Sequence, residues 1–248
     1  MNACAACRRA NMTGSRGLRR SRAVLAVSIV FLALGGAAAA QTSQQVDVAL
    51  VLAIDCSYSV DTREFELQKT GLTQAFRNPL VLAAIQAGER QAIAVSIIEW
   101  SKPGAQEIAV PWTLVSDAPS AEALAARIEA APRLIADGAT SISSMIQFGI
   151  AYLATSPVSS ARKAIDISAD GRNNSGEKIA TAKALARSYG VTINGLAILN
   201  EVKTLDRYFE KYMITGSGAF VMRADDYDNY ATAILRKLLQ EIGNPPIS

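Results

Sequence analysis

Oxygen-bearing side chains alternate along one short segment of the chain, in the pattern D-x-S-x-S formed by Asp55, Ser57 and Ser59. The segment directly follows a run of apolar residues, so we expect it to lie where a buried strand ends. Groups at alternate positions of a loop can converge on one point, and ligands that are all oxygen suit a hard cation such as Mg²⁺. The pattern also arises by chance, and Ser59 or Asp61 would serve equally well as a helix cap.

Two further oxygen-bearing side chains stand at comparable places in the sequence. Thr140 begins a predicted helix, and Asp170 ends a predicted strand. In open α/β sheets, ligand sites lie beyond the carboxyl ends of the strands. We therefore expect five residues to meet at one edge of the sheet as a divalent-metal site: Asp55, Ser57, Ser59, Thr140 and Asp170.

The elements that would position these residues alternate between strands and helices. Apolar runs predict strands over residues 46–54, 91–98, 107–112, 164–168, 191–199 and 219–222, the third ending in a Pro-Trp-Thr turn. A first helix should begin at the capping box of Asp61 and Glu64 and stop at Asn78-Pro79. Later helices are predicted over residues 120–130, 142–153, 176–188, 204–212 and 226–242. This alternation predicts one α/β domain with a doubly wound, mostly parallel sheet flanked by helices.

The first 40 residues have the order of a secretory signal peptide. Residues 8–22 carry six arginines and no acid, and an apolar run from Ala23 then ends in four alanines at Ala40. This order predicts export and cleavage after Ala40, which leaves a periplasmic or secreted protein; an uncleaved membrane anchor is the alternative. The predicted division of the chain is a signal peptide over 1–40, a short segment over 41–45, the domain over 46–242 and a tail over 243–248.

Composition excludes several classes of function. The 248 residues are 50% hydrophobic and 19% charged, which suits a folded domain and is too apolar for a disordered chain. Histidine is absent, which excludes histidine-dependent hydrolase triads and HExxH zinc proteases. Six of the 25 Lys and Arg residues lie in the leader, so 19 remain against 22 Asp and Glu, a net charge of −3. We therefore expect no nucleic-acid partner.

Residues 46–242 resemble a von Willebrand factor type A (vWA) domain. The resemblance rests on D-x-S-x-S after the first strand, a later threonine at Thr140, and the pair Asp170-Gly171. Phrases such as EFELQK, DGRNN and TINGLAI further resemble an uncharacterised branch of exported bacterial vWA proteins. The resemblance implies a Rossmann-like fold that carries a metal-ion-dependent adhesion site (MIDAS).

The resemblance also implies a role for each candidate ligand. Ser57, Ser59 and Thr140 would bind Mg²⁺ directly, and Asp55 and Asp170 would hold it mainly through water. Mn²⁺ and Ca²⁺ are the alternative ions. The family has small residues inside the serine loop, whereas this chain has a cysteine at 56 and a tyrosine at 58, of which the phenol would narrow access to the metal or stack on a partner.

These features favour a protein-binding or adhesion module over an enzyme. A partner protein's Asp or Glu carboxylate would complete the metal's coordination, and no general base is evident. The alternative is a metal- or serine-dependent hydrolase with Ser57 or Ser59 as nucleophile, but the chain has no G-x-S-x-G elbow and no S-x-x-K after either serine. A third interpretation is a vWA scaffold whose metal site is inactive. A membrane is a partner only if the leader is kept as an anchor.

Several polar residues near the predicted site have two interpretations each. Glu99 would accept a hydrogen bond from metal-bound water or be a solvated strand end. Asp166, inside a strand, would lie at a sheet edge or have a buried partner, since an unpaired buried carboxylate is costly. Asn173 and Asn174 would orient the preceding loop through Asx turns or start a helix. Arg172 would face an acidic partner or be solvated.

Overall fold

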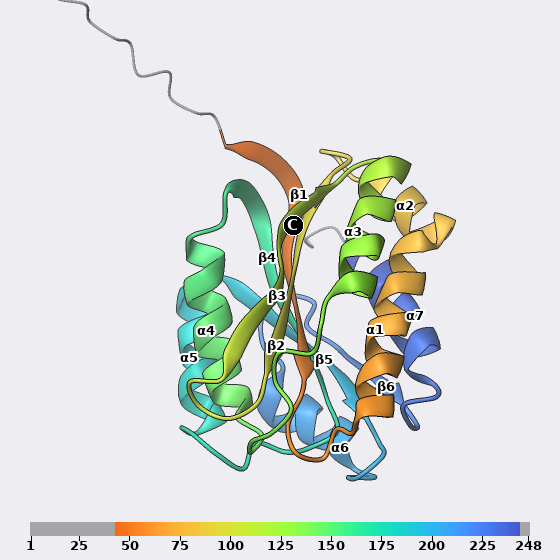
Figure 1. Cartoon of the computed structure of the whole chain (residues 1–248). Coiled ribbons are helices and arrows are strands. Elements are labelled where there is room, and N and C mark those ends of the chain that lie inside the picture. Colours follow the sequence, from red (N-terminus) through yellow and green to blue (C-terminus); the bar gives the residue numbers. More distant parts are fainter. Residues whose placement is uncertain (1–42, 244–248) are drawn as a thin grey trace, which may run out of the picture. The chain divides into compact units, whose positions relative to one another are not determined.

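The computed structural model describes residues 43–243, which form a six-stranded sheet between two layers of helices (Figure 1). The strands lie in the order β3-β2-β1-β4-β5-β6, and every neighbouring pair is parallel except β2 with β3. The predicted doubly wound, mostly parallel α/β sheet is confirmed. The strands are β1 (Gln44–Asp55), β2 (Ile93–Trp100), β3 (Gln106–Val115), β4 (Val158–Ala169), β5 (Val191–Ile198) and β6 (Val221–Ala224).

Helices cover both faces of the sheet. Figure 1 shows α1, α2, α3 and α7 on one face and α4 and α5 on the other. Within residues 43–243, no helix has the length and apolar character needed to span a bilayer. The helical elements are α1 (Thr62–Arg77), α2 (Pro79–Gln86), α3 (Ala118–Ala130), α4 (Ile142–Ala154), α5 (Ile179–Ser188), α6 (Leu205–Tyr208), the π-helical turn η1 (Phe209–Met213) and α7 (Tyr230–Gly243).

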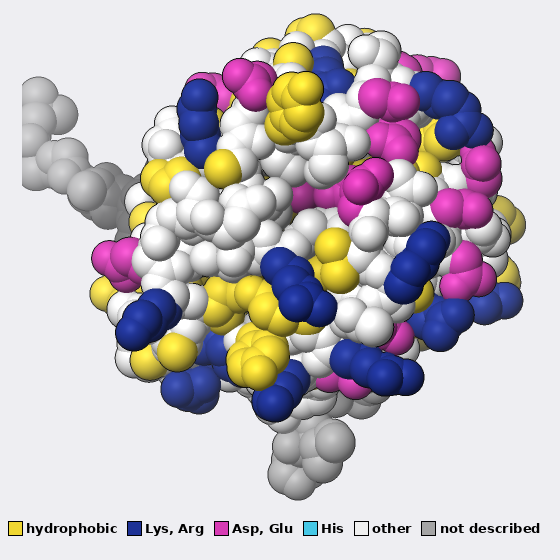
Figure 2. All heavy atoms as spheres, turned by 90° about the horizontal axis from the view of Figure 1, so that it is seen from below, with side chains coloured by type: hydrophobic (Ala, Val, Ile, Leu, Met, Phe, Trp, Pro, Cys, Tyr) yellow, Lys and Arg dark blue, Asp and Glu magenta, His cyan; other side chains and the backbone are white. Residues whose placement is uncertain are grey.

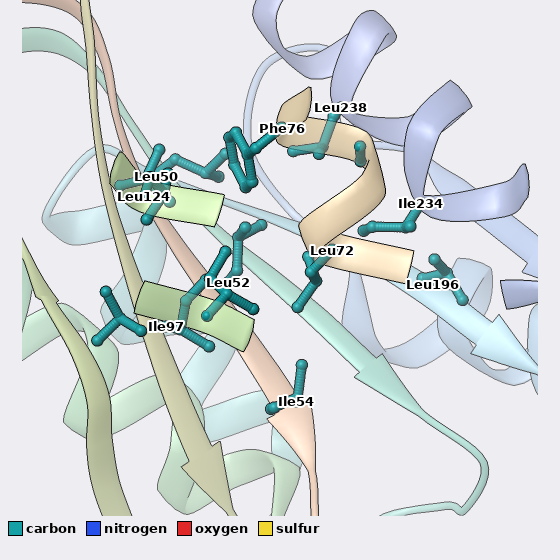
Figure 3. Packing of buried hydrophobic residues seen from close by; sticks show 14 of the residues in the cluster. Leu50, Leu52, Ile54, Leu72, Phe76, Ile97, Leu124, Leu196, Ile234 and Leu238 are labelled. Carbon is teal, nitrogen blue, oxygen red and sulfur yellow. The ribbon is translucent and has the colours of Figure 1, made fainter. Parts of the chain in front are cut away.

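Strand β1 is the centre of the core and is buried on both faces. Its alternate side chains Leu50, Leu52 and Ile54 pack against α1, α3 and α7 (Figure 3), whereas Ala49 and Val51 join the cluster under α4 and α5. Each fully buried aliphatic side chain contributes roughly 1.5–3 kcal/mol relative to an exposed one. A strand anchored in this way gives the loop that follows Asp55 a fixed starting point.

Helix α2 is not predicted by the sequence, because Asn78-Pro79 indicates the end of a helix. Asn78 does end α1, since its N–H donates to the Ala75 carbonyl. Its side-chain oxygen also accepts the Leu80 N–H at 2.9 Å and so begins a second helix, with Pro79 in the first turn. Proline lacks only an N–H that the first turn of a helix does not use, so the same two residues end one helix and start the next.

The predicted turn at Pro111 is wrong, since β3 runs on to Val115. The strand lies at the edge of the sheet, where a missing backbone donor can face away from the neighbouring strand. Its pairing with β2 shifts register between Val95 and Ile98, which accommodates the proline.

Other boundaries differ from prediction at the element ends. Gly176 has a φ of +78° and lies in a loop, so α5 begins only at Ile179. The helix predicted over 204–212 divides into α6 and η1. Helix α7 begins at Tyr230 rather than at residue 226. The predicted signal peptide, residues 1–40, lies outside the described residues.

Candidate metal centre

The five predicted ligands come together at the carboxyl end of the sheet, at the bottom of Figure 1. Asp55 is the last residue of β1 and pairs with Trp100 of β2, while Asp170 directly follows β4 on the other side of β1. Thr140 comes from the loop before α4. Since β1 has a parallel neighbour on each side, its carboxyl end is the switch point at which open α/β sheets hold ligands.

A chain of short contacts joins the side-chain oxygens. Thr140 Oγ1 donates to Ser57 Oγ at 3.3 Å, and Ser57 Oγ lies 3.4 Å from Ser59 Oγ. Ser59 Oγ donates to Asp170 Oδ1 at 2.8 Å. Asp55 Oδ1 accepts the backbone N–H of Ser57 at 2.8 Å. This bond holds the serine turn, residues 56–59 (the serine loop of the sequence), against the end of β1. Three hydroxyls and two carboxylates therefore lie together at this end of the sheet.

One oxygen of each carboxylate has no hydrogen-bond partner among the described residues. Both Asp55 and Asp170 are fully buried, and in each the Oδ2 atom is unpaired. Burial, followed by the negative charge of Asp170, raises the pKa of Asp55 to about 7. Burial also raises the pKa of Asp170, against the hydrogen bond from Ser59. Buried polar atoms without partners are rare because they are costly. These two atoms, beside three hydroxyls, fit a hard divalent cation.

Hydrogen bonds between loops fix the positions of the proposed ligands relative to one another. The Tyr58 N–H donates to the Gly138 carbonyl, and the Asn174 N–H donates to the Thr140 carbonyl, both at 2.9 Å. In return, Asn174 Oδ1 accepts the Thr140 N–H at 2.9 Å. Gly171 allows this close approach, since a Cβ there would lie 3.2 Å from Thr140 Oγ1.

The Asx-turn interpretation of the two asparagines is corrected by these bonds. Asn174 binds the Thr140 backbone, and Asn173 Oδ1 accepts the Ser143 N–H in α4 at 3.0 Å. Both side-chain oxygens therefore join the loop after β4 to the start of α4, while Asn173 Nδ2 also donates to the Glu177 carbonyl at 3.2 Å within its own loop.

Helix α1 and Arg133 fix the end of the serine turn through hydrogen bonds. The predicted capping box is present, with Asp61 accepting the Glu64 N–H and Glu64 accepting the Asp61 N–H. The Arg133 guanidinium donates to the carbonyls of Val60 and Asp61, and it lies 5.1 Å from the Phe65 ring centroid. The end of the turn is thus fixed to the start of α1.

Glu99 and Asp166 are both buried and paired. Glu99 Oε2 accepts the backbone N–H groups of Leu134 at 2.7 Å and Ile135 at 2.9 Å, so the residue anchors the segment after α3 and is not a solvated strand end. Asp166 Oδ1 lies 2.9 Å from Lys237 Nζ, in a fully buried ion pair. The buried-partner interpretation of Asp166 is therefore the correct one.

The two unusual residues of the serine loop point in opposite directions. Cys56 is fully buried and its thiol donates to the Ile54 carbonyl at 3.7 Å. Burial raises the pKa of this thiol, so it stays protonated and neutral. Tyr58, by contrast, is 84% exposed at the surface, next to the serine ligands.

Two further residues near the site lie outside the motifs that predict it. Gln68 is buried in α1 and donates to the Asp55 carbonyl at 3.2 Å. Its signal is a polar residue on the apolar stripe between Phe65 and Leu72, at helical spacing. Tyr227 is buried near Asp170, where burial and the negative charge of Asp170 raise the pKa of the phenol. No local pattern marks Tyr227, because it reaches the site from the segment before α7.

The oxygen donors of this site differ from those of a His, Cys or carboxylate metal cluster and from a serine paired with a catalytic base. No group of three His, Cys, Asp or Glu side chains is placed to hold a metal in the part of the chain that the structure describes, so the candidate centre depends on hydroxyls. In the same part of the chain, no Lys or Arg side chain hydrogen-bonds to Ser57 or Ser59 as a base would. The chemistry that this arrangement supports is cation binding.

Comparisons with known proteins agree with the fold. A family model described as "Protein of unknown function (DUF1194)" matches residues 45–246. Among curated proteins, no match to the sequence is found. Among solved structures, a von Willebrand factor type A protein from Catenulispora acidiphila is 18% identical with a TM-score of 0.56; the match covers 80% of this chain and 43% of that one.

Two further structures share the fold. Proximal thread matrix protein 1 from the mussel byssus, with a zinc-occupied MIDAS motif, is 15% identical with a TM-score of 0.61, covering 81% of this chain and 49% of that one. The vWF domain of the type V pili tip protein Mfa5 from Porphyromonas gingivalis is 12% identical with a TM-score of 0.53, covering 82% and 98%. This chain thus spans less than half of the Catenulispora and byssus chains. At these identities, the likeness establishes the vWA fold.

Proposed function

Because this chain belongs to the family described as "Protein of unknown function (DUF1194)" and has the vWA fold, we propose that it is an exported module that binds a partner protein through a divalent metal ion. The observation that carries the proposal is the pair of buried, unpaired carboxylate oxygens, Asp55 Oδ2 and Asp170 Oδ2, beside three linked hydroxyls. Buried carboxylate oxygens without partners are costly, and a bound cation would offset that cost.

The proposed ligands divide into two kinds. Ser57, Ser59 and Thr140 would contact the ion through neutral oxygens, and Asp55 and Asp170 would hold it through water. Mg²⁺ is the first choice because the donors are all oxygen, with Mn²⁺ and Ca²⁺ as alternatives. When bound, the ion supplies a positive charge that can accept a carboxylate from outside.

The ligand hydroxyls and Tyr58 would favour an acidic residue of a partner protein. Neutral hydroxyls leave much of the ion's charge uncompensated, so a partner's Asp or Glu would be attracted. Tyr58, which is 84% exposed, offers a rigid aromatic contact beside the docking point. Export fits the signal-peptide pattern of residues 1–40, after which residues 41–248 would be the mature chain. The pili tip protein and the byssus matrix protein among the structural neighbours are consistent with this setting.

The proposal is tested by capture from an envelope extract on the immobilised protein in Mg²⁺. We expect captured proteins to be released by EDTA, to be recovered when Mg²⁺ is restored, and to be absent with Asp55→Ala. Asp117→Ala, which removes a helix cap on α3, is the matched control and should capture normally. Capture that survives both EDTA and Asp55→Ala would refute metal-dependent docking.

A further inference from the structure

An open groove of about 720 Å³ lies next to the candidate metal centre, between the loop after β4, helix α5 and the segment formed by α6 and η1. We call it the α5 groove. Figure 2 views this end of the molecule and shows Lys and Arg side chains around exposed hydrophobic ones on its lower part. The groove is lined by residues 173–180, Lys183, Arg187, Tyr208, Lys211 and Tyr212.

The α5 groove adjoins the metal centre through Asn174. Asn174 lines the groove and exchanges two hydrogen bonds with the backbone of Thr140, a proposed ligand. Arg172, two residues after Asp170, lies over the Tyr208 ring at 5.3 Å and donates to Thr204 Oγ1. A chain that docks at the metal and leaves in this direction therefore enters the groove directly.

The charge of the groove is positive, although the predicted mature chain is net negative. Its lining includes four cations, Lys178, Lys183, Arg187 and Lys211, and among residues 43–243 none of them forms an ion pair. The single acid in the lining, Glu177, accepts a hydrogen bond from Gln147 of α4. Burial, followed by the positive charge of Arg187, lowers the pKa of Lys183.

The groove also offers aromatic surface. The rings of Tyr208 and Tyr212 lie 5.3 Å apart, and Lys211 Nζ lies 5.1 Å from the Tyr212 ring. Tyr212 is 47% exposed, so its ring can take up an apolar side chain from outside. Unpaired cations beside exposed aromatic rings suit a peptide that mixes carboxylates with apolar or aromatic side chains.

We propose that the α5 groove binds an acidic, extended segment of the same partner whose carboxylate docks at the metal centre. This inference rests on the proposed function and adds the chemistry of the partner to it. Helix α5 has 10 residues and is therefore about 15 Å long. An extended peptide covers that length with roughly four or five residues. The partner segment thus carries the anchoring Asp or Glu with further acids and an apolar residue within about five positions of it.

The test uses two fluorescein-labelled peptides and the purified full chain in excess Mg²⁺. One peptide has a single Asp in a Gly/Ser background, and in the other the same Asp is followed by Glu-Tyr-Glu-Glu. Fluorescence anisotropy should show that the acid-rich peptide binds about tenfold or more tightly, with an advantage that shrinks in high salt. Equal affinity for the two peptides would overturn the inference.

Charge-reversal variants test whether the tighter binding of the acid-rich peptide comes from the α5 groove. Lys211→Glu should weaken binding of the acid-rich peptide about three- to tenfold and leave the single-Asp peptide unchanged. Lys102→Glu is the matched control, since Lys102 is exposed at the same end of the sheet, in the loop between β2 and β3, outside the groove. If both reversals weaken binding equally, only the net charge matters and the groove is not the site.

The same titrations separate this inference from the proposed function. Loss of both peptides in EDTA, together with equal affinities in Mg²⁺, would retain metal-dependent docking and refute the groove. Binding of the acid-rich peptide that is sensitive to Lys211→Glu but indifferent to EDTA would refute metal-dependent docking, and with it a single segment that occupies both sites. Tight, EDTA-sensitive and Lys211-sensitive binding would support both.

Discussion

At the scale of single residues, the candidate site brings two buried carboxylates and three hydroxyls together, an arrangement that a divalent cation would stabilise. Asp55 and Asp170 are buried, and each leaves one oxygen without a hydrogen bond among the described residues. Residue type and spacing predicted these two and the three hydroxyls, because chemistry and place in the strand pattern agree. Gln68 has only a weak signal, a polar residue on the apolar stripe of α1, and Tyr227 has none, because it reaches the site through tertiary packing.

Asp55→Asn should separate metal binding from folding. In EDTA, we expect the free energy of unfolding to rise by about 1 kcal/mol, because one of two neighbouring buried negative charges is removed. The asparagine oxygen can still accept the Ser57 N–H. Urea unfolding with EDTA and with Mg²⁺ measures both effects: Mg²⁺ should stabilise the wild type and leave the variant unchanged. A variant that is less stable in EDTA and still responds to Mg²⁺ would contradict this account.

A second residue-scale prediction concerns Asp166, which lies in β4 with Lys237 and Glu241 of α7. Burial is the largest cause that raises the pKa of Asp166 to about 7, opposed by Lys237 and assisted by the negative charge of Glu241. Because this pKa lies above its ordinary value of 3.8, the resulting stability is fully present below about pH 4 and is lost as the pH rises through 7.

Urea unfolding from pH 5.5 to pH 8 in constant Mg²⁺ tests this effect. The wild type should lose about 2 kcal/mol more than Asp166→Asn over that range, since the amide does not titrate. Glu241 keeps Lys237 paired in the variant, at 3.3 Å. Parallel pH profiles for the two proteins would show that Asp166 is ionised throughout.

At the scale of elements, most helices and strands followed from apolar periodicity and caps, and the errors have identifiable physical causes. Asn78-Pro79 can end a helix or start one, and only packing against α7 and the rest of the core decides that α2 forms. Pro111 breaks a central strand but is tolerated at an edge, and strand order cannot be read from local sequence. The mixed α6–η1 segment depends on how Phe209 and Met213 are buried.

The start of α1 should matter to the site in a way that other helix starts do not. Asp61→Ala removes the cap that follows the serine turn and should cost about 1 kcal/mol of stability. Asp117→Ala removes the equivalent capping box on α3 at a similar cost. Calorimetric titration should show that only Asp61→Ala weakens Mg²⁺ binding, by several-fold. Equal Mg²⁺ affinity in the two variants would show that the cap of α1 does not position the serine ligands.

At the scale of the whole molecule, the sheet order explains why residues more than a hundred positions apart meet. Strand β1 lies between β2 and β4, so the loops after β1 and β4 and the loop before α4 share one end of the sheet. Ligand that binds only the folded state stabilises it, by about 2.7 kcal/mol at a hundred times its Kd. For a domain of this size that corresponds to roughly 5–10 °C in Tm.

We therefore expect Mg²⁺ to raise the Tm of the full chain by that amount when measured by differential scanning calorimetry. Asp170→Ala should melt at the same temperature with or without the ion, since it lacks one of the two buried carboxylates. A similar increase in Tm in both proteins would place Mg²⁺ elsewhere on the molecule.

The most direct measurement is isothermal titration of Mg²⁺ or Mn²⁺ into the wild type and Thr140→Val, which removes one hydroxyl and little volume. Thr73→Val is the control, because that buried hydroxyl donates only to Lys69 within α1. We predict one ion bound per wild-type chain, the same binding in Thr73→Val, and none in Thr140→Val. No ion bound by the wild type, or unchanged binding in Thr140→Val, would contradict a metal centre built from Asp55, Ser57, Ser59, Thr140 and Asp170.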